Sequence, residues 1–512
     1  MAISKDTTEQ LNSNLGKNSA LPRICLLVMF LLAALIRSDE IRAPGHLIER
    51  EYNSAIFAHA FYLSGNDKVE QWHKDVAFAA RDQLPLLEPP VTEYLVSLLY
   101  RIMGKEEIWY SRYLTSLFWL IGGMFLYKTV QMLASVEAAL IAVGYYLFVP
   151  WGIIISRSFQ PDSLMMMMFL LSLHGMVLYF KRPSWSRLVL VGTLSGMTLL
   201  FRPLVLFTLF GAMIALTIHE KGTWVSLIGR RLVVFIFLSL IFPLAFYGYG
   251  IYIAGFLQGQ VDLSFRPYLL TRWTFWRGWF DLGTSVAGHS FLLIAILGFF
   301  ALRDRFTRYV IAGLTVGYLI FGMLFTFHVH THPYYHIQFF PIIALCASPL
   351  LAAVFTTYRR LAGGYWWMPV TACLLAISYF SWREVRSTLY TTVFEDPSLA
   401  REVGEIVRHS PRTVFVAYHY GVPLEYYGEL AGAPWPVRID DPFYRRPGAQ
   451  ELSVQERIDH LGFTPEYFVI TDFGLYRRKH QDLDTYLESA CSSQLETSDY
   501  LIYSQCQTLS KH

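Results

Sequence analysis

Long apolar runs dominate the pattern of hydrophobic and polar positions along this chain. A bilayer core about 30 Å thick needs about 20 helical residues to cross it, and runs of this order recur throughout. They lie at 22–37, 113–132, 136–155, 161–180, 187–201, 203–219, 232–255, 289–302, 309–327, 337–356 and 365–382. The pattern predicts a mainly α protein, a polytopic transmembrane helical bundle with about eleven membrane helices.

Basic residues gather in alternate turns between these runs. One set of turns holds Lys128, Lys181, Arg182, Arg187, Lys221, Arg230, Arg231, Arg303, Arg305, Arg308, Arg359 and Arg360. The opposite turns hold little more than Arg157 and Arg202. The positive-inside rule therefore predicts a multi-pass protein of the cell (inner or plasma) membrane, with a cytoplasmic N-terminus and a periplasmic or extracellular C-terminal region.

Polar segments suggest how the chain is divided. The expected parts are a cytoplasmic tail at 1–21, a transmembrane catalytic domain at 22–385 that includes a first outer loop at 38–111, and an extracytoplasmic α/β domain at 386–512. In the first outer loop, apolar residues recur at helical spacing from Ile48 to Leu63 and again after Pro90. This spacing predicts two amphipathic helices that lie in the membrane interface.

The last part of the chain has the pattern of a small α/β domain. Short apolar runs at 414–417, 467–470 and 500–503 predict strands, and 483–487 indicates a helix. Asp396-Pro397 is a typical helix start, with Asp as the N-cap and Pro in the first turn. Cys491 and Cys506 could form a disulfide on the outer side of the membrane, and the sequence leaves open whether they do.

Composition agrees with a membrane protein and narrows its partners. Hydrophobic residues make up 54% of the chain and charged residues 16%, against about a quarter charged in soluble proteins. The net charge of +3 comes from basic residues dispersed in short loops, so it does not predict nucleic-acid binding. The sequence has neither a glycine motif for nucleotides nor a zinc-ligand spacing.

Acidic residues in the first outer loop are the first candidates for chemistry, because carboxylates close to an apolar membrane boundary are costly. They are Glu49, Glu51, Asp82 and Glu88. On a helix, Glu49 and Glu51 point about 200° apart, so only one of them can face a given site. Glu51 borders the apolar stripe. The alternative is that these are ordinary solvated carboxylates.

Two further charges stand at the outer ends of predicted membrane helices. Asp162 follows Pro161 and could be either a helix N-cap or a catalytic carboxylate. Arg202 precedes Pro203 where topology gives no reason for a cation. It could bind an anion such as a lipid phosphate, or it could pair with a carboxylate.

A histidine-rich tract, His328-Val-His-Thr-His332-Pro-Tyr-Tyr-His336, precedes one membrane helix. Imidazole is a common metal ligand, but hydrogen bonding to a phosphate or sugar is the favoured interpretation, and no metal is expected. Trp273, Trp276 and Trp279 in the second outer loop could stack on sugar rings or belong to an interfacial aromatic belt.

Taken in order, these motifs resemble the GT-C superfamily of membrane glycosyltransferases, in the branch of the protein O-mannosyltransferases and the lipid A aminoarabinose transferase. Ala58-His-Ala-Phe-Tyr-Leu-Ser-Gly65 resembles the end of that branch's first loop helix, and Glu88-Pro-Pro-Val91 resembles its Glu-Lys-Pro-Pro-Leu element. Gly104 ends the following helix, and Arg112 resembles the arginine that opens the next one. His332-Pro-Tyr-Tyr335 is similar to the family's His-Pro-Tyr-Tyr segment. The resemblance covers about residues 22–380.

The resemblance implies an inverting transfer of a sugar from a polyprenyl-phosphate donor to a glycan, lipid or protein acceptor, without a cofactor. It implies catalytic roles for Glu51, with Glu49 as second choice, and for Asp162. It implies donor phosphate or sugar binding by Arg202, His332, Tyr334, Tyr335, His336, Arg157 and Glu88. The sequence departs from the family pattern at Arg50, which stands where the family has Asp.

Two other functions are consistent with the same chain. A transporter or flippase of a lipid-linked sugar would also need many helices, but transporters place ionisable residues at mid-membrane, and here they gather at the outer boundary. A scaffold subunit without catalysis is the third interpretation, and Arg50 gives it some support.

Overall fold

The computed structural model describes residues 20–43, 48–222, 229–257, 265–362, 365, 367–390, 396–435 and 452–506. The expected cytoplasmic tail at 1–21 therefore lies almost wholly outside the described residues. The chain forms two compact units. The first, here called the helical unit, comprises residues 1–41, 112–157 and 161–388, and the second, the mixed unit, comprises 42–111, 158–160 and 389–512.

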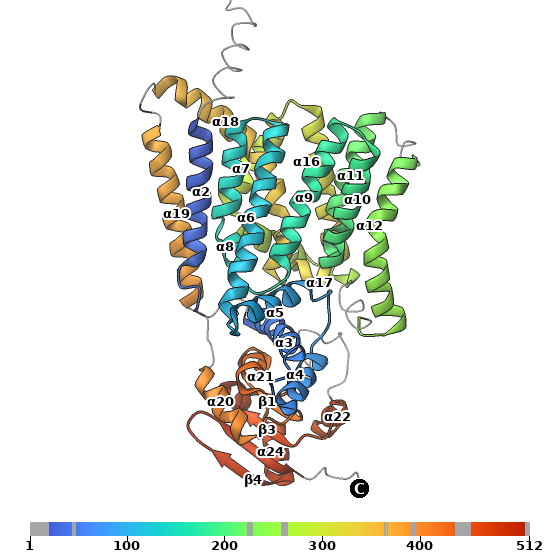
Figure 1. Ribbon diagram of the computed structural model, residues 1–512, viewed down its shortest axis with the longest axis vertical. Helices are drawn as coiled ribbons and strands as arrows, with labels where there is room; N and C mark the ends of the chain where they lie inside the picture. The colour runs from blue at the N-terminus through green and yellow to red at the C-terminus, as the bar shows by residue number, and fades with distance from the viewer. Residues whose placement is uncertain are drawn as a thin grey trace, which may run out of the picture. The chain divides into compact units, whose positions relative to one another are not determined.

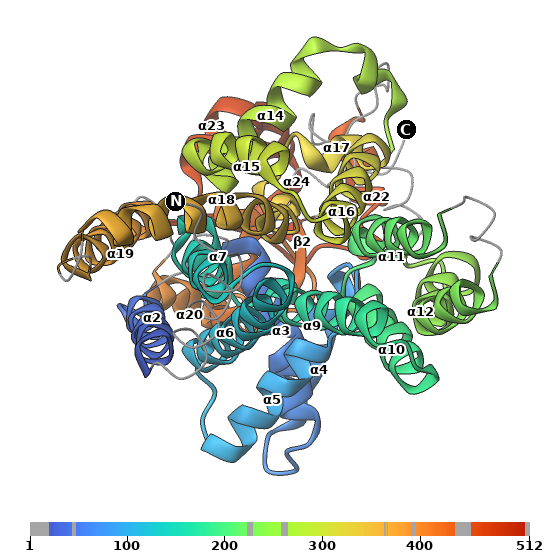
Figure 2. The same cartoon turned by 90° about the horizontal axis from the view of Figure 1, so that it is seen from above.

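The helical unit is built from helices that run roughly parallel, as the end-on view in Figure 2 shows. The long helices are α2 (Ala20–Ser38), α6 (Ile108–Leu133), α7 (Val136–Phe148), α9 (Asp162–Lys181), α10 (Trp185–Phe201), α11 (Leu206–Lys221), α12 (Arg230–Gly248), α14 (Trp273–Ala287), α15 (His289–Ala301), α16 (Arg305–Leu324), α18 (Phe339–Ala362) and α19 (Trp367–Tyr390). Shorter elements are α8 (Pro150–Ser156), η1 (Pro203–Val205), η3 (Tyr249–Ile253), η4 (Pro267–Thr271), α17 (Thr326–Val329) and η5 (Pro333–His336).

Every predicted membrane run coincides with helix, which confirms the mainly α bundle. Among the described residues, six helices are long and apolar enough to cross a membrane, or up to eight if each bent pair counts as one span. The total of eleven crossings stays a prediction. The second outer loop differs from expectation, because its tryptophans lie on a helix, α14.

Two sharp bends have local causes. The chain turns by 62° between α7 and α8, because Pro150 disfavours helical backbone at Val149, whose φ and ψ are −62° and 126°. It turns by 95° between α14 and α15 at Gly288, whose φ of +85° suits glycine.

Close packing between α11 and α16 depends on residues that lack side chains. A Cβ atom added to Gly313 would lie 2.3 Å from the carbonyl oxygen of Gly211. Small residues at such positions let helix backbones approach each other in a membrane bundle. Figure 1 and Figure 2 both show α11 and α16 side by side.

The mixed unit joins the first-loop helices to the C-terminal sheet. Its helices are α3 (Ile48–Ser64), α4 (Gln71–Gln83), α5 (Val91–Met103), α20 (Pro397–Ile406), α21 (Val422–Gly428), α22 (Val454–Asp459), α23 (Phe473–Lys479) and α24 (Gln481–Ala490), with the short η7 (Tyr418–Gly421). The helices expected from Ile48 and after Pro90 are both present, and Gly104, with φ of +66°, ends the second. The helix α4 was not expected.

The helices of the first outer loop pack within the mixed unit, where α3 contacts α4, α5 and α21. The division of the chain at residues 21 and 385 stays a prediction. The buried face of α3 includes Tyr52, Ala55 and Ile56. This face of the amphipathic helix is therefore covered by protein, and the place of the first-loop helices at the membrane interface stays a prediction.

The C-terminal sheet is mixed and has five strands. They are β1 (Thr413–Val416), β2 (Gly432–Pro434), β3 (Tyr467–Ile470), β4 (Cys491–Glu496) and β5 (Leu501–Cys506), in the order β2-β1-β3-β5-β4. β1 runs parallel to β2 and β3, and β5 runs antiparallel to β3 and β4. The three predicted strands are β1, β3 and β5. Cys491 pairs with Cys506 across β4 and β5, and the two form a disulfide.

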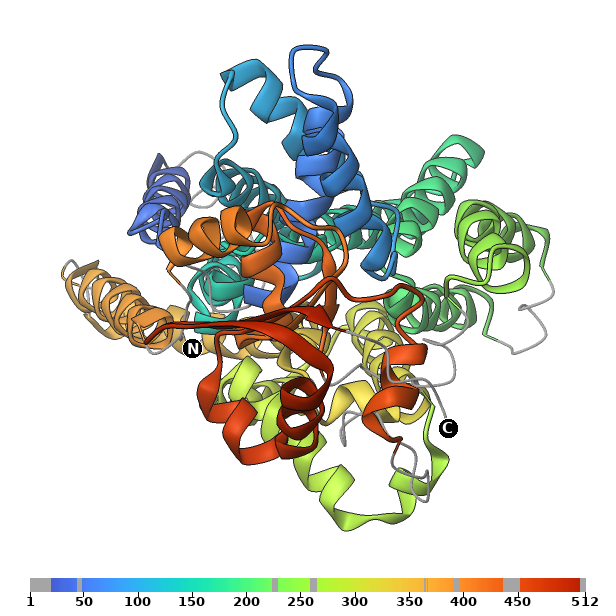
Figure 3. The ribbon, with the colours of Figure 1, turned by 90° about the horizontal axis from the view of Figure 1, so that it is seen from below.

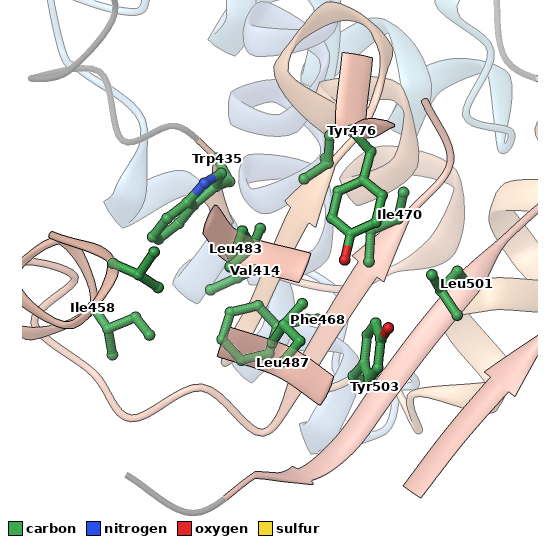
Figure 4. Packing of buried hydrophobic residues seen from close by; sticks show 12 residues of the cluster. Val414, Trp435, Ile458, Phe468, Ile470, Tyr476, Leu483, Leu487, Leu501 and Tyr503 are labelled. Atoms are coloured by element: carbon green, nitrogen blue, oxygen red, sulfur yellow. The ribbon is translucent and has the colours of Figure 1, made fainter. Parts of the chain in front are cut away.

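Alternation along the strands builds a core on each face of the sheet, because successive side chains of a strand point to opposite faces. Val414, Phe468 and Tyr503 pack with α22, α23 and α24 in the core drawn in Figure 4. Phe415 and Val469 face the other way and pack with α20 and α21. Figure 3 shows helices on both sides of the sheet.

Candidate functional site

Glu51 is a fully buried carboxylate in the first turn of α3. Its side chain is 0% exposed, and its Oε1 accepts a hydrogen bond of 3.2 Å from the backbone N–H of Phe159. Phe159 lies in the short segment 158–160, which packs in the mixed unit. A bond to a fixed backbone donor orients the carboxylate. Of the two candidates on this helix, Glu51 is the buried one, and Glu49 is partly exposed.

Arg50, the residue that departs from the family pattern, forms an ion pair with Glu88 at 3.5 Å. Both side chains are largely buried in the mixed unit. The charge at position 50 is therefore paired within the mixed unit.

Glu93 on α5 is a second buried carboxyl group beside α3. Glu93 is 6% exposed, and its Oε1 accepts a hydrogen bond of 2.7 Å from Ser54 Oγ. Burial raises the pKa of Glu93 to about 7, and the Ser54 hydrogen bond opposes that rise only in part. Sequence reasoning did not select this residue, because a helical Glu carries no sign of its burial.

Glu93 should make stability depend on pH. The unfolded carboxyl has its ordinary pKa of 4.5 and the folded one a pKa of about 7, so folding favours the protonated form. Its contribution, on the order of 3 kcal/mol, is complete below pH 4.5 and is lost as pH rises through about 7. We expect the Tm of the wild type to fall from about pH 5 to about pH 8 by more than that of Glu93→Gln. Identical pH profiles for the two proteins would contradict this role.

In the helical unit, Asp162 and Arg202 form a buried ion pair. Arg202 Nη2 donates to Asp162 Oδ2 at 2.8 Å, and the two side chains are 6% and 3% exposed. Asp162 is the first residue of α9, where a negative charge is stabilised by the helix dipole, and Pro161 occupies the cap position. Arg202 thus pairs with a carboxylate, which was one of its two alternatives. Asp162 is not the N-cap of α9, and its catalytic role stays a prediction.

The Arg157 side chain donates hydrogen bonds to the backbone of the turn that follows α2. Its Nη2 donates to the carbonyl oxygen of Asp39 at 2.6 Å and to that of Glu40 at 3.2 Å. Arg112 donates in the same way to the carbonyl oxygen of Ile41 at 2.7 Å. Both arginines are buried and hold the segment that leads into the first outer loop, so these contacts indicate a structural role.

The His-Pro-Tyr-Tyr segment presents a group of neighbouring rings, tilted or edge-on to one another. Its members His332, Tyr334 and Tyr335 are partly exposed, and the rings of Tyr334 and Tyr335 lie 4.7 Å apart. His332 Nδ1 is 2.7 Å from Thr331 Oγ1. Partly exposed imidazole and phenol groups in one turn are suited to binding a sugar or a phosphate.

His336 differs from the rest of the tract because both of its ring nitrogens are engaged inside the protein. Tyr318 Oη lies 2.6 Å from Nδ1, and the Val329 carbonyl oxygen lies 2.8 Å from Nε2. Burial lowers the pKa of His336 to about 4, so the neutral ring accepts from Tyr318 and donates to Val329. These contacts favour a positioning role for His336, and its direct contact with the donor stays a prediction.

The tryptophans of α14 do not form one sugar-binding face. Trp279 is 7% exposed and donates from Nε1 to Tyr318 Oη at 3.2 Å, so it belongs to the core. Trp273 is exposed. In the described part of the chain, no three His, Cys, Asp or Glu side chains gather in a way that could hold a metal ion.

One segment of the chain matches a model of a known protein family. Residues 87–247 match the family model described as dolichyl-phosphate-mannose-protein mannosyltransferase. The matched segment begins just before Glu88 and contains the Asp162–Arg202 pair. A comparison with proteins of curated function finds no significant match.

Solved structures share the fold over nearly the whole chain. ArnT from Cupriavidus metallidurans bound to undecaprenyl phosphate is 11% identical, with 97% of this chain and 100% of that chain covered at a TM-score of 0.58. Archaeal oligosaccharyltransferase AglB from Archaeoglobus fulgidus, in complex with an inhibitory peptide and a dolichol-phosphate, is 12% identical, with 96% of this chain and 75% of that chain covered at a TM-score of 0.54. At these identities the likeness shows the fold alone. This chain therefore shares the fold of ArnT and AglB, and its residues 87–247 match a family model of mannosyltransferases.

Proposed function

We propose that this protein transfers a sugar from a polyprenyl-phosphate donor to a hydroxyl or amine of a cell-envelope glycan, lipid or protein at the outer face of the membrane, with inversion at the anomeric carbon. Two observations support a lipid-phosphate donor. The similar ArnT structure holds undecaprenyl phosphate, and the similar AglB structure holds dolichol-phosphate. The family description over residues 87–247 names dolichyl-phosphate-mannose.

The observation that carries the proposal is the buried, oriented carboxylate of Glu51. A general base must be held within reach of the proton that it removes, and the bond from the Phe159 N–H fixes Glu51 in this way. As the acceptor oxygen or nitrogen attacks the anomeric carbon, its proton passes to Glu51. The bond from the sugar to the phosphate breaks, and the lipid phosphate leaves as an anion that needs no proton.

Arg202 supplies positive charge for the departing phosphate. A guanidinium matches the geometry of phosphate oxygens, and its bond to Asp162 holds its plane in place before the donor binds. Preorganised charge of this kind stabilises the negative charge that develops in a transition state. In this proposal Asp162 acts through Arg202.

The partly exposed rings of the His-Pro-Tyr-Tyr segment complete the donor site. We assign His332, Tyr334 and Tyr335 to contacts with the donor's phosphate or sugar. The proposed mechanism uses Arg202 and one base and includes no metal. The active side faces outward, following the distribution of Lys and Arg in the loops.

Transfer can be tested with purified protein in lipid nanodiscs. Radiolabelled polyprenyl-phosphate sugars are incubated with a cell-envelope fraction, and a nucleotide-linked sugar serves as the control donor. We expect label to move from the polyprenyl phosphate to the fraction, to stay on the nucleotide donor, and to transfer equally well in the presence of a metal chelator. Loss of transfer with the chelator would contradict the metal-free mechanism, and transfer only from the nucleotide donor would contradict the proposed donor.

A further inference from the structure

Gln160 is a fully buried side chain whose amide is not satisfied within the protein. It is 0% exposed, and among the described residues neither its Oε1 nor its Nε2 has a hydrogen-bond partner. Glutamine is mostly exposed in proteins, and buried polar atoms are nearly always hydrogen-bonded. An unsatisfied buried group costs about 1–3 kcal/mol, and Gln160 has two such atoms. A side chain this costly needs an explanation.

Its place in the chain suggests the explanation. Gln160 follows Phe159, whose backbone N–H donates to Glu51, and it stands two residues before Asp162, which pairs with Arg202. The Gln160 backbone N–H is itself held by the carbonyl oxygen of Ser158 at 2.9 Å, so the residue belongs to a defined turn. Gln160 therefore directly follows, in the same turn, the residue whose backbone N–H orients the proposed base.

The chemistry of the amide selects the class of ligand. An amide presents one acceptor oxygen and an NH₂ donor side by side. A phosphate diester only accepts hydrogen bonds, so it could satisfy Nε2 and would leave Oε1 without a partner. Neighbouring hydroxyl groups on a sugar ring each donate and accept, so they can satisfy both atoms together.

We propose that Gln160 is a specificity-determining residue that binds adjacent hydroxyl groups of the donor's sugar, and not its phosphate. This inference rests on the proposed function, because it assumes that the donor is a lipid-linked sugar. A site built to hydrogen-bond a hydroxyl strongly rejects a ligand that lacks it, because its own buried groups are then left unsatisfied. Gln160 thereby distinguishes the sugar-bearing lipid from the bare carrier that remains after transfer.

The test compares equilibrium binding of bare polyprenyl phosphate with that of polyprenyl phosphate carrying mannose, glucose, galactose or N-acetylglucosamine. We expect the wild type to bind at least one sugar-bearing lipid about tenfold more tightly than the bare carrier. This is the difference in Kd expected from two additional hydrogen bonds. In Gln160→Leu that ratio should fall to about one, with the affinity for bare carrier unchanged. A Gln160→Glu variant keeps the size of the side chain but offers only acceptors, so it should lose the preference as well.

Thermal stability separates binding from a structural role. Gln338 is a matched control, because it is also buried but its Oε1 accepts from Thr208 Oγ1 at 2.9 Å. Gln338→Leu should lower the Tm, whereas Gln160→Leu should keep or raise it, since it removes unsatisfied atoms.

Three results would overturn the inference. They are a preference for the sugar that survives in Gln160→Leu, an equal loss of affinity for sugar-bearing and bare lipid, and a wild type that prefers none of the sugars. A buried water bridging the amide would produce the first of these. A failure of the proposed function gives a different result. In that case the wild type binds polyprenyl phosphate neither with nor without sugar, and this result would overturn both proposals.

Discussion

Glu51→Gln is expected to reduce transfer by about 10³-fold or more while leaving the protein folded and able to bind its donor. Glutamine has nearly the same shape as glutamate, and its side-chain oxygen can still accept the hydrogen bond from Phe159 N–H. It cannot take a proton from the acceptor. The loss should therefore appear in the rate of the chemical step, measured in single-turnover experiments, and not in the Kd for the donor.

Glu49→Gln is the matched control for this change. Glu49 lies on the same turn of α3, but it is partly exposed while Glu51 is fully buried. It should retain transfer within a few-fold of the wild type. Full activity in Glu51→Gln, or a loss confined to Glu49→Gln, would remove Glu51 from the role of base.

Arg202→Met is expected to lower both stability and donor affinity. The substitution leaves Asp162 as a buried carboxylate without its cation, which typically costs about 3–5 kcal/mol. Tm should fall accordingly. The Kd for polyprenyl phosphate should rise by about tenfold or more, because a guanidinium that meets the phosphate is lost.

A double variant separates these two effects. In Arg202→Met with Asp162→Asn, the buried charge is removed together with its partner, so much of the Tm should return. Donor affinity should remain weak, because the cation is still absent. Arg231→Ala serves as a control, since Arg231 forms an exposed ion pair with Glu220 at 3.6 Å and such pairs contribute about 1 kcal/mol or less. Restored donor affinity in the double variant would show that Arg202 acts only in folding.

The helices and the main strands could be predicted because each leaves a periodic signal in the sequence. Tyr467–Ile470 is a strand with the predicted bounds, and Asp396 caps the helix that begins at Pro397 by accepting from Ser398 N–H. Shorter or more polar elements such as β2 and α4 lack such a signal. What covers the apolar face of α3 could not be predicted either, because an apolar stripe has the same sequence pattern whether membrane or protein covers it.

The candidate site was predictable only as a set of residue types. The sequence pointed to Glu51, Asp162 and Arg202, but their partners depend on contacts between distant segments. Phe159 N–H binds Glu51 across 108 residues, and Arg202 binds Asp162 across 40. The burial of Glu93 and Gln160 depends on tertiary packing for the same reason.

Arg50 shows how a departure from a family pattern can be misread. By itself it supported a protein that had lost catalysis. The structure pairs Arg50 with Glu88, so the residue has a structural partner. The carboxylate one residue later, Glu51, is buried and accepts a hydrogen bond from Phe159 N–H.

In the proposed reaction the sugar leaves its lipid carrier, and a double-labelled donor tests this separation directly. The donor, a polyprenyl-phosphate sugar, is labelled with tritium in the lipid and with carbon-14 in the sugar. The reconstituted wild type is incubated with this donor and a cell-envelope fraction. We expect carbon-14 to move to the acceptor while tritium stays in polyprenyl phosphate. Movement of both labels together across the membrane, with their ratio unchanged, would contradict it and would favour a transporter of the intact lipid-linked sugar.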